Sequence, residues 1–498
     1  MDFVPDFATF ARAYRNGRNQ TVSVTRVSDT ETPVSAMLKL GGGRPYSFLL
    51  ESMEGGAVRG RYSIIGREPD LIWRCAGGKA EINREAVTGG GTFVPSAKAP
   101  LGDLRALLGE IRIDDPHQPQ PMAAGLFGYL GYDMARQMER LPTHKPAGVA
   151  VPDALLIRPT LLAIFDQIEN KFTLVTPAWF DKTQAAEAAY EAATKRLERA
   201  LEDLAKPAPP MPAPRKAAPP AEPSTNMSEA DFCRMVARAK DYIRAGDIFQ
   251  VVLSQRFSVP FAQSSFDLYR AVRRLDPSPF LFHFDFGDFA VVGSSPEILV
   301  RVRDSKVTIR PIAGTRPRGI GNRSDAELAQ ELLADPKELA EHLMLLDLGR
   351  NDVGRVAKTG TVTVTARNSI EYYRHVMHIV SNVEGELAAA FEPLDALIAG
   401  FPAGTVSGAP KVRAMHVIDE LEPDRRGVYA GCIGYFGANG SMDTCIAIRT
   451  AVVKDGTMHV QAGAGIVYDS DPQSEYRECV AKARGMTRAA EEAAKSAD

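Results

Sequence analysis

Apolar and polar residues alternate in many short segments of this chain, and a period of two residues is typical of half-buried β-strands. Short turns rich in glycine and aspartate separate several of these segments, which favours antiparallel pairing. We therefore predict an α+β fold, with antiparallel or mixed β-sheets flanked by helices. The predicted strands are 46–52, 61–66, 161–166, 172–177, 249–257, 289–295, 361–366, 432–437, 444–453 and 459–469.

Apolar residues recur every three or four positions in other segments, which predicts amphipathic helices. One helix begins after Ser228, because Asp231 three residues later can complete a capping box. Two more begin at Asp335-Pro336 and Asp471-Pro472, since aspartate caps a helix and proline fits its first position.

A proline-rich segment divides the chain. Residues 206–223 contain eight prolines and almost no large aliphatic side chain, which is typical of a stiff, solvated linker. A chain of 498 residues also exceeds what one hydrophobic core usually serves. We predict an N-terminal domain over 1–205, the linker, and a C-terminal domain over 224–498.

Composition excludes several classes of protein. A net charge of −3 argues against a nucleic-acid or membrane-surface partner, and no apolar run approaches the roughly 18 residues of a membrane span. The first 20 residues lack the apolar core of a signal peptide. Five scattered cysteines without a C-x-x-C pair suit a reducing compartment and exclude a thiolate metal site. We expect a soluble, cytoplasmic protein.

The segment from Phe401 to Lys411 combines two glycines, two hydroxyl side chains and a lysine just before a predicted helix (412–421). Small residues let a ligand approach the backbone, and the helix start offers N–H groups to an anion. The segment lacks the Gly-Lys-Ser/Thr ending of a phosphate-binding loop. It is compatible with an anion site and also with an ordinary loop.

Glutamates stand three residues apart in two predicted helices, as Glu338 with Glu341 and Glu475 with Glu478. This spacing puts each pair on one helix face, which fits either a solvated surface or a cation site. Four carboxylates that met would repel one another unless a cation lay between them. Oxygen ligands without cysteine or histidine suit Mg²⁺.

Five ordered blocks resemble the chorismate-utilising enzymes, and most closely the large (synthase) subunits of anthranilate synthase. The resemblance covers essentially the whole chain except the linker. It implies that family's fold and a Mg²⁺-dependent carbon–oxygen lyase that converts chorismate and ammonia to anthranilate and pyruvate, the first step of tryptophan biosynthesis. The blocks are 311–319, 345–352, 375–385, 401–411 and 463–478.

The same resemblance implies roles for the paired glutamates and for the substrate contacts. Glu341 and Glu478 match direct Mg²⁺ ligands, while Glu338 and Glu475 match outer carboxylates that act through water. Arg449 suits the enolpyruvyl carboxylate of chorismate, because a planar guanidinium forks onto a carboxylate. The implied substrate-binding residues are Gly314, Thr315, Thr405, Tyr429, Arg449, Gly463, Ala464, Gly465 and Lys482.

Two positions distinguish the reactions of this family. Members that add water resemble one another in a lysine where this chain has Gln250, and aminodeoxychorismate synthases carry a nucleophilic lysine where it has Ala313. Both departures favour direct attack of ammonia at C2 over isochorismate or aminodeoxychorismate formation. A third possibility, a non-catalytic tryptophan-sensing subunit, is opposed by the intact Glu297, Arg449 and metal carboxylates.

Two further catalytic residues are implied by the resemblance. Glu297 matches the general acid that protonates the departing C4 hydroxyl. His378 matches a residue tied to the second step, in which C2 loses a proton and pyruvate leaves. A lone histidine is also a common structural hydrogen-bonding group, so whether His378 is the base stays open at this point.

The resemblance also implies a feedback site for tryptophan and a partner. The sequence over 276–281 departs from the usual Asn-Pro-Ser-Pro-Tyr-Met of inhibited members, yet we expect tryptophan to inhibit. Cys432 lies in an amidotransferase-like turn, but the downstream His-Pro-Glu pattern is missing, so a glutamine amidotransferase subunit should supply ammonia in a heterotetramer. The implied tryptophan-binding residues are Glu51, Ser52, Pro279, Phe280, Leu281, Tyr435 and Cys445.

Overall fold

The computed structural model describes most of the chain, including every residue that the sequence singles out for a site. Residues 210–221 of the predicted linker lie outside the described residues. The described ranges are 2–41, 44–54, 58–86, 91–114, 120–142, 145–209, 222–319, 323–373 and 376–495.

Within the described ranges the named strands pair with one another in antiparallel fashion, which confirms the predicted α+β fold class. In order they are β1 (Gln20–Val27), β2 (Ser47–Glu54), β3 (Val58–Ala76), β4 (Lys79–Asn83), β5 (Val94–Pro95), β6 (Gly125–Leu130), β7 (Ala154–Asp166), β8 (Lys171–Ala178), β9 (Ser224–Thr225), β10 (Gln250–Pro260), β11 (Phe280–Asp285), β12 (Phe289–Ser295), β13 (Ile298–Arg303), β14 (Lys306–Ile309), β15 (Ile312–Pro317), β16 (Thr363–Tyr372), β17 (Val376–Glu386), β18 (Gly408–Ala409), β19 (Cys432–Gly437), β20 (Met442–Ile446), β21 (Thr450–Lys454) and β22 (Thr457–Ile466).

The helices start where the capping residues predict. Ser228 and Asp231 form a reciprocal capping box at the start of α5, and the Asp335 side chain caps α8 with proline in its first turn. The helices are α1 (Phe7–Arg15), α2 (Pro33–Gly41), α3 (Pro100–Glu110), α4 (Ala186–Ala205), α5 (Glu229–Arg244), α6 (Ser265–Leu275), α7 (Asp325–Ala334), α8 (Pro336–Gly354), α9 (Pro393–Gly400), α10 (Lys411–Leu421) and α11 (Pro472–Lys495), with 3-10 turns η2 (Tyr132–Gln137) and η3 (Gly404–Val406).

Two sheet arms extend from the paired strands β3 and β7. The first arm runs β3–β2–β11–β12–β21–β22–β10. The second runs β7–β6–β19–β20–β13–β14–β17, with β15 and β16 also paired to β17. Each arm therefore begins with two strands from before the linker and continues with strands from after it, and the division into two domains stays a prediction.

A compact aromatic core fills the space between the two arms. Phe48 and Phe284 come from the first arm and Phe127 and Tyr435 from the second, and all four belong to one buried cluster. The rings of Phe48 and Phe127 stack with their centroids 4.7 Å apart. Stacked and tilted aromatic pairs add to the hydrophobic stabilisation of burial, so this cluster holds the arms at a fixed spacing.

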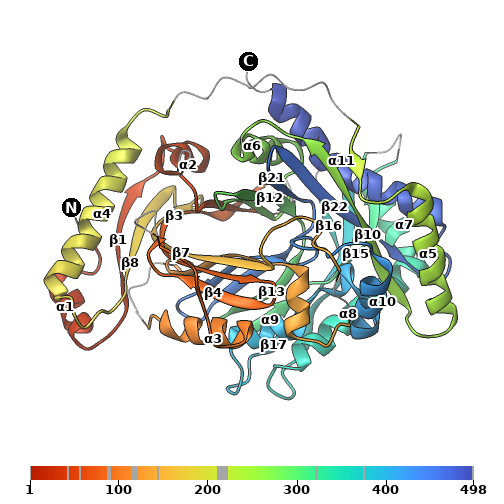
Figure 1. Ribbon diagram of the computed structural model, residues 1–498, viewed down its shortest axis with the longest axis horizontal. Helices are drawn as coiled ribbons and strands as arrows, with labels where there is room; N and C mark the ends of the chain where they lie inside the picture. Colours follow the sequence, from red (N-terminus) through yellow and green to blue (C-terminus); the bar gives the residue numbers. More distant parts are fainter. Residues whose placement is uncertain are drawn as a thin grey trace.

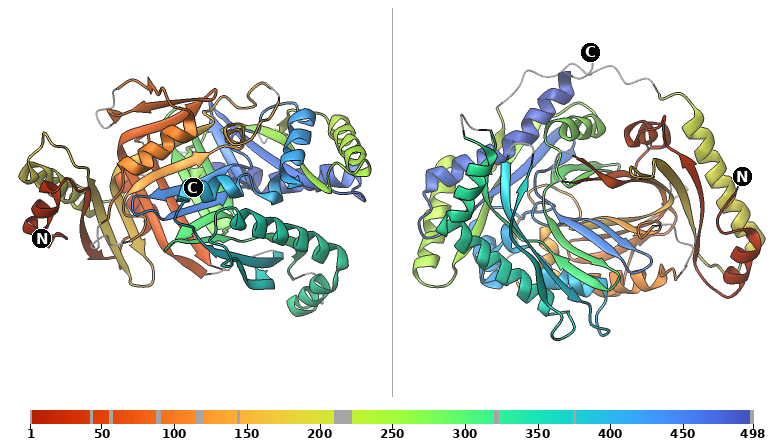
Figure 2. Two further views of the ribbon diagram at one scale, coloured as in Figure 1. Left: turned by 90° about the horizontal axis from the view of Figure 1, so that it is seen from below. Right: turned by 180° about the vertical axis from the view of Figure 1, so that it is seen from behind.

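Helices cover the outside of the sheets (Figure 1). The helices α1 and α4 lie together at one end of the molecule, and α5, α7, α10 and α11 lie at the other (Figures 1 and 2). α8 packs on β15 and β17 of the second arm, whereas α11 packs on β22 of the first. No helix in the described part of the chain is long and apolar enough to cross a membrane.

The chain passes from one arm to the other at two adjacent places. One crossing joins β12 to β13 and contains Glu297; the other joins β20 to β21 and contains Arg449. The crossings bond to each other, because Ser294 N donates to Arg449 O at 3.2 Å and Ile446 N donates to Glu297 O at 3.0 Å. The single strand predicted over 444–453 is therefore wrong: the backbone of Arg449 takes a left-handed φ of 48°, which ends the extended run.

Candidate active site

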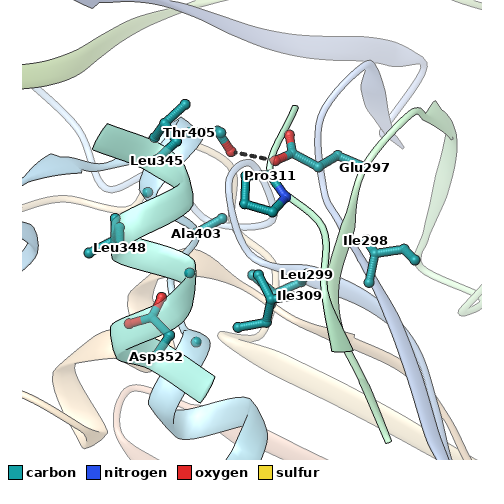
Figure 3. Close-up of a pocket in the computed structure, with 13 residues that line it drawn as sticks. Glu297, Ile298, Leu299, Ile309, Pro311, Leu345, Leu348, Asp352, Ala403 and Thr405 are labelled. Atoms are coloured by element: carbon teal, nitrogen blue, oxygen red, sulfur yellow. Dashed lines mark hydrogen bonds between the residues drawn. The ribbon is translucent and has the colours of Figure 1, made fainter. Parts of the chain in front are cut away.

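Glu297 lies at one end of a small cavity between α8, η3 and strands β13 and β14 (Figure 3). The cavity has a volume of about 30 Å³, room for about one water molecule. The Thr405 hydroxyl donates a hydrogen bond to Glu297 Oε1 at 3.0 Å. The structure thus brings together a glutamate and a threonine that the sequence assigned to two separate segments.

Burial controls the protonation of Glu297. The side chain is 7% exposed, and the loss of solvation raises its pKa from 4.5 to about 8. Hydrogen bonds from Thr405 and from the backbone of Ile312 act in the opposite direction but do not cancel this effect. The carboxyl group is therefore protonated at neutral pH and can donate a proton.

His378 is a buried, neutral imidazole on β17. Its Nδ1 lies 3.0 Å from the carbonyl oxygen of Gly314 and 3.1 Å from Thr315 Oγ1. A carbonyl oxygen can only accept, so Nδ1 carries the proton and Nε2 keeps its lone pair. Burial, opposed by the Gly314 hydrogen bond, lowers the pKa to about 4.

Gln250 and Glu341 face each other across the gap between β10 and α8. Gln250 Nε2 donates to Glu341 Oε1 at 3.2 Å, while the buried amide oxygen of Gln250 has no hydrogen-bond partner. The absence of a side chain at Gly465 makes room for this amide, because a Cβ there would lie 2.8 Å from Gln250 Nε2. Burial, together with the charges of Glu338 and Glu478, raises the pKa of Glu341.

Arg316 holds Glu338, the other glutamate of that pair. Its guanidinium Nη1 donates to Glu338 Oε1 at 3.1 Å, and it also binds Asp335 and Glu331. Gly314 lies beside the same carboxylate, since a Cβ there would come within 3.1 Å of Glu338 Oε2. The sequence did not single out Arg316, although its place directly after the Gly314–Thr315 pair was a usable signal.

The second glutamate pair, Glu475 and Glu478 on α11, lies near the turn at Gly463, which in turn contacts Tyr429. Lys482 Nζ binds Glu478 Oε1 at 2.8 Å and donates to the carbonyl oxygen of Gly463 at 2.9 Å. A Cβ on Gly463 would lie 2.7 Å from the hydroxyl of Tyr429, so only glycine fits there without displacing the tyrosine. Burial raises the pKa of Glu475 on the same helix face.

The charges of Glu338, Glu341, Glu475 and Glu478 affect one another, but the four carboxylates do not form a preformed metal site. Across the described ranges, no three Asp, Glu, His or Cys side chains gather closely enough to hold a metal ion. Glu338, Glu341 and Glu478 are instead each held by a neighbouring side chain: Arg316, Gln250 and Lys482. Their oxygen chemistry fits Mg²⁺. Burial and the charges of Glu338 and Glu478 raise the pKa of Glu341, an effect that a bound cation would oppose.

Lys411, the cation of the predicted anion loop, is paired with a buried carboxylate. Its Nζ forms an ion pair with Asp352 Oδ2 at 2.8 Å and donates to the carbonyl oxygen of Gly400 at 3.3 Å. Both side chains are about nine-tenths buried. The lysine therefore braces α10 against α8, and of the polar groups in that loop Thr405 reaches Glu297.

Arg449 is half-buried and points to the end of α6. Its Nη1 lies 3.4 Å from Asp276 Oδ2, which is an ion pair that leaves the other guanidinium nitrogens available to a carboxylate. The charges of Arg449 and Lys482 both act on His378. Arg449, Lys482 and His378 are thus within electrostatic reach of one another.

The residues assigned to tryptophan also come together. Strand pairing places Ser52 opposite Phe280 and Glu51 opposite Leu281, and a hydrogen bond links Cys445 on β20 to Ser295 on β12, the strand that pairs with β11. Glu51 is fully engaged: Arg273 donates to both its oxygens at 2.5 and 3.1 Å, Tyr269 donates to Oε2, and Ser63 to Oε1. Its partners on α6 were not found from the sequence, although their four-residue spacing puts them on one helix face.

Comparison with known proteins gives a consistent match over the whole length. Residues 66–488 match the family model described as chorismate binding enzyme. Anthranilate synthase component 1 of Cereibacter sphaeroides is 55% identical over 98% of this chain and 97% of its own length, and that of Thermus thermophilus is 47% identical over 94% and 97%.

Two solved structures share the fold. Anthranilate synthase component I from Streptococcus pneumoniae TIGR4 superposes with a TM-score of 0.77 at 38% identity, covering 93% of this chain and 99% of that one. MenF, the menaquinone-specific isochorismate synthase from Escherichia coli, superposes with a TM-score of 0.70 at 20% identity, covering 97% and 100%, which supports the fold alone.

Proposed function

The chain belongs to the chorismate-binding enzymes, in the branch of anthranilate synthase component 1, and from this premise we propose how its residues perform the reaction. Members of this branch are lyases of tryptophan biosynthesis that act on chorismate. We infer that this chain joins ammonia to C2 of chorismate and releases water and then pyruvate, leaving anthranilate. The reaction takes place beside the two crossings that contain Glu297 and Arg449.

The observation that carries the proposal is the burial of the Glu297 carboxyl group, which raises its pKa to about 8. A C4 hydroxyl is a poor leaving group unless it gains a proton, and an acid with a pKa of about 8 still holds its proton at neutral pH. The Thr405 hydroxyl fixes the orientation of this acid. Glu297 therefore protonates the departing hydroxyl as the new bond forms at C2.

Gln250 binds and positions ammonia, the incoming nucleophile. Its unpaired amide oxygen is an acceptor for an N–H of ammonia, and burial of that oxygen makes the hydrogen bond favourable. Ammonia carries its own lone pair and needs no base, whereas water does. Because an amide removes no proton, the site favours amination over isochorismate formation, and Ala313 offers no nucleophile for the aminodeoxychorismate route.

We propose that Glu341 and Glu478 bind Mg²⁺ directly and that Glu338 and Glu475 hold its water molecules. Bound Mg²⁺ supplies positive charge that balances the ring carboxylate of chorismate. Arg449 forks onto the enolpyruvyl carboxylate. Lys482, Tyr429 and the turn Gly463–Gly465 complete the binding surface.

His378 serves the second step. With Nδ1–H bound to Gly314 O, its Nε2 lone pair is the free position, and the low pKa of about 4 keeps it neutral at all working pH values. We propose that Nε2 accepts the C2 proton as pyruvate leaves. A weak base suffices because the ring becomes aromatic in the same step.

We further propose that tryptophan inhibits by binding beside Ser52 and Phe280, and that a glutamine amidotransferase subunit supplies ammonia in a cytoplasmic heterotetramer. The pairing of β2 with β11 supports the first idea, since it brings together segments that are distant in sequence. Component 1 in the names of the relatives supports the second.

The purified chain tests the proposal without its partner. Incubated with chorismate, Mg²⁺ and excess ammonium salt at alkaline pH, it should form fluorescent anthranilate and an equal amount of pyruvate. A matched Gln250→Lys variant should lose amination and is the control for nucleophile choice. Isochorismate, or no conversion, from the wild-type chain would contradict the proposal.

A further inference from the structure

Arg426 and Glu422 form an ion pair whose side chains are only 1% and 3% exposed. Glu422 caps the end of α10, and Arg426 follows four positions later. Arg426 Nε donates to Glu422 Oε2 at 2.9 Å, and its Nη2 donates to Oε1 at 2.6 Å. Because well-packed apolar side chains often replace such a pair without loss of stability, stability alone gives no reason for two buried charges at this place.

The ion pair completes an interrupted edge of β10. β18 pairs with the first residues of β10, and Val252 N still donates to Ser407 O at 2.9 Å, but the neighbouring chain is then the turn η3 instead of a strand. In an antiparallel ladder the N–H and C=O of one residue face the same neighbour. Here Arg426 Nη2 donates to Val252 O at 2.6 Å, and Ser254 N donates to Glu422 Oε1 at 2.8 Å. The two side chains thus take the place of a strand.

The same guanidinium also holds η3. Arg426 Nη1 donates to Val406 O at 2.7 Å. The preceding residue is Thr405, whose hydroxyl donates to Glu297 Oε1 at 3.0 Å (Figure 3). A planar guanidinium donates in fixed directions, so the carbonyl groups of Val406 and Val252 keep a fixed spacing. Since η3 has three residues, a fixed carbonyl group at its end restricts the Thr405 hydroxyl.

Two tyrosine rings enclose Arg426. Its guanidinium carbon lies 4.6 Å from the ring centroid of Tyr132 and 5.6 Å from that of Tyr429, distances typical of cation–π contacts. Tyr429 is a proposed substrate contact, and its hydroxyl leaves no room for a side chain at Gly463. Arg426 therefore contacts three parts of the proposed site: η3, the strand that begins at Gln250, and Tyr429.

We propose that Arg426 is a positioning residue for proton transfer: it fixes η3 so that the Thr405 hydroxyl keeps its hydrogen bond to the Glu297 carboxyl group. This inference rests on the proposed function, in which Glu297 is the acid. Arg426 acts through Val406 and Thr405. Glu422 orients the guanidinium and links it to β10.

The test uses the full chain with ammonium salt and a double variant, Arg426→Met with Glu422→Gln. Glutamine keeps an oxygen that can accept from Ser254, and no charge is left buried without its partner, so the variant should fold. Loss of orientation should lower kcat by up to about 10²-fold. The hydrogen bond from Thr405 lowers the pKa of Glu297. Its loss should therefore move the alkaline limb of kcat/KM for chorismate to higher pH than in the wild type.

Thr405→Val tests whether Arg426 acts through Thr405. This variant should move the alkaline limb in the same direction, and adding it to the double variant should move the limb no further, because both changes remove one and the same hydrogen bond. Arg426→Lys keeps the charge beside Glu422 but has one nitrogen in place of a planar fork. We expect it to fold and to cause a smaller shift in the same direction.

Arg158→Met with Asp70→Asn is the matched control. Arg158 on β7 is also a buried arginine; it binds Asp70 at 2.7 Å and lies over the ring of Trp179 at 4.6 Å. This control should keep the kcat and the alkaline limb of the wild type. Cooperative unfolding in urea shows that each variant is folded before its kinetics are compared.

An alkaline limb at the wild-type pH in the folded Arg426 variants overturns the proposal. A shift of the same size in the control also overturns it, because any loss of a buried ion pair would then have the same effect. A wild-type enzyme without an alkaline limb contradicts Glu297 as the acid and removes the group that Arg426 would position. The wild type thus tests the proposed function, and the variants test the role of Arg426.

Discussion

Two carboxyl groups at opposite ends of one small cavity have different electrostatic surroundings (Figure 3). Glu297 and Asp352 are both buried, and burial raises the pKa of each. Asp352 has a buried cation, Lys411, at 2.8 Å, which opposes that effect. Glu297 instead accepts hydrogen bonds from the hydroxyl of Thr405 and the backbone of Ile312, neither of which carries a charge, so its proton is retained at neutral pH.

The comparison shows that the partner, more than the depth of burial, decides what a carboxyl can do. A carboxylate beside a lysine is a structural anchor, because the pair is stable only while both charges remain. A carboxyl without a cation stays protonated and becomes an acid. The following predictions alter one end of the cavity or the nucleophile side of the site.

Glu297→Gln should have the largest effect. The amide fills the same space but donates no acidic proton, so we expect kcat to fall by about 10²–10⁴-fold with the fold intact. Steady-state anthranilate fluorescence measures the loss. Asp103→Asn is the matched control, because Asp103 on α3 is as buried as Glu297 but is bonded by Trp73 and Ser96; it should keep most activity. Equal losses in the two variants would contradict a special role for Glu297.

The same variant should respond differently to pH in unfolding experiments. A pKa raised from 4.5 to about 8 means that the folded state holds its proton while the unfolded state releases it. Stability of the wild type therefore falls as pH rises through this window. The free energy of unfolding of Glu297→Gln has no such decrease. The difference between the variant and the wild type, measured by urea unfolding, should therefore grow in favour of the variant up to about pH 8. A gap that does not change with pH would contradict the raised pKa.

Lys411→Met at the other end should cost stability more than chemistry. It leaves Asp352 buried without its cation, and we expect a loss of about 3–5 kcal/mol in the free energy of unfolding. The double variant Lys411→Met with Asp352→Asn should recover part of it, since no buried charge is then unpaired. A Lys411→Met protein as stable as the wild type in urea would show that the pair is not an anchor.

Of the substitutions at Glu297, Lys411 and Gln250, Gln250→Leu should have the smallest effect. It removes the acceptor for ammonia and the hydrogen bond to Glu341 but no proton-transfer group, so we expect an approximately tenfold rise in KM for ammonia. The control Gln250→Glu keeps an acceptor and should bind ammonium instead. If Gln250→Leu left the ammonia KM unchanged, the proposed nucleophile position would be wrong.

Sequence reasoning found most of the elements, because caps and alternation are local signals. The starts of α5 and α8 follow from Ser228 and Asp335, and β12 and β19 have the predicted bounds. The break at Arg449 was missed, since a left-handed residue in an apolar run has no local signature. The order of the strands in the two arms also depends on long-range pairing that periodicity does not encode.

The sequence predicted which residues belong to the candidate site better than it predicted their contacts and their protonation. The family resemblance named Glu297, Thr405 and Gln250, but it did not show that Thr405 bonds Glu297 or that the Gln250 oxygen lacks a partner. Arg316 and Arg273 were missed because arginines are common on surfaces. Only the folded chain shows that each holds a glutamate assigned to a ligand.

The pH dependence of kcat/KM for chorismate tests the central claim most directly, with the rate corrected for the concentration of free ammonia. The measurement should span about pH 6.5 to about pH 9.5 and include Glu297→Gln. We predict that wild-type kcat/KM falls above about pH 8 with the loss of one proton, and that the low activity of the variant has no such limb. A wild-type value that stays level or rises through pH 8 would contradict Glu297 as the acid.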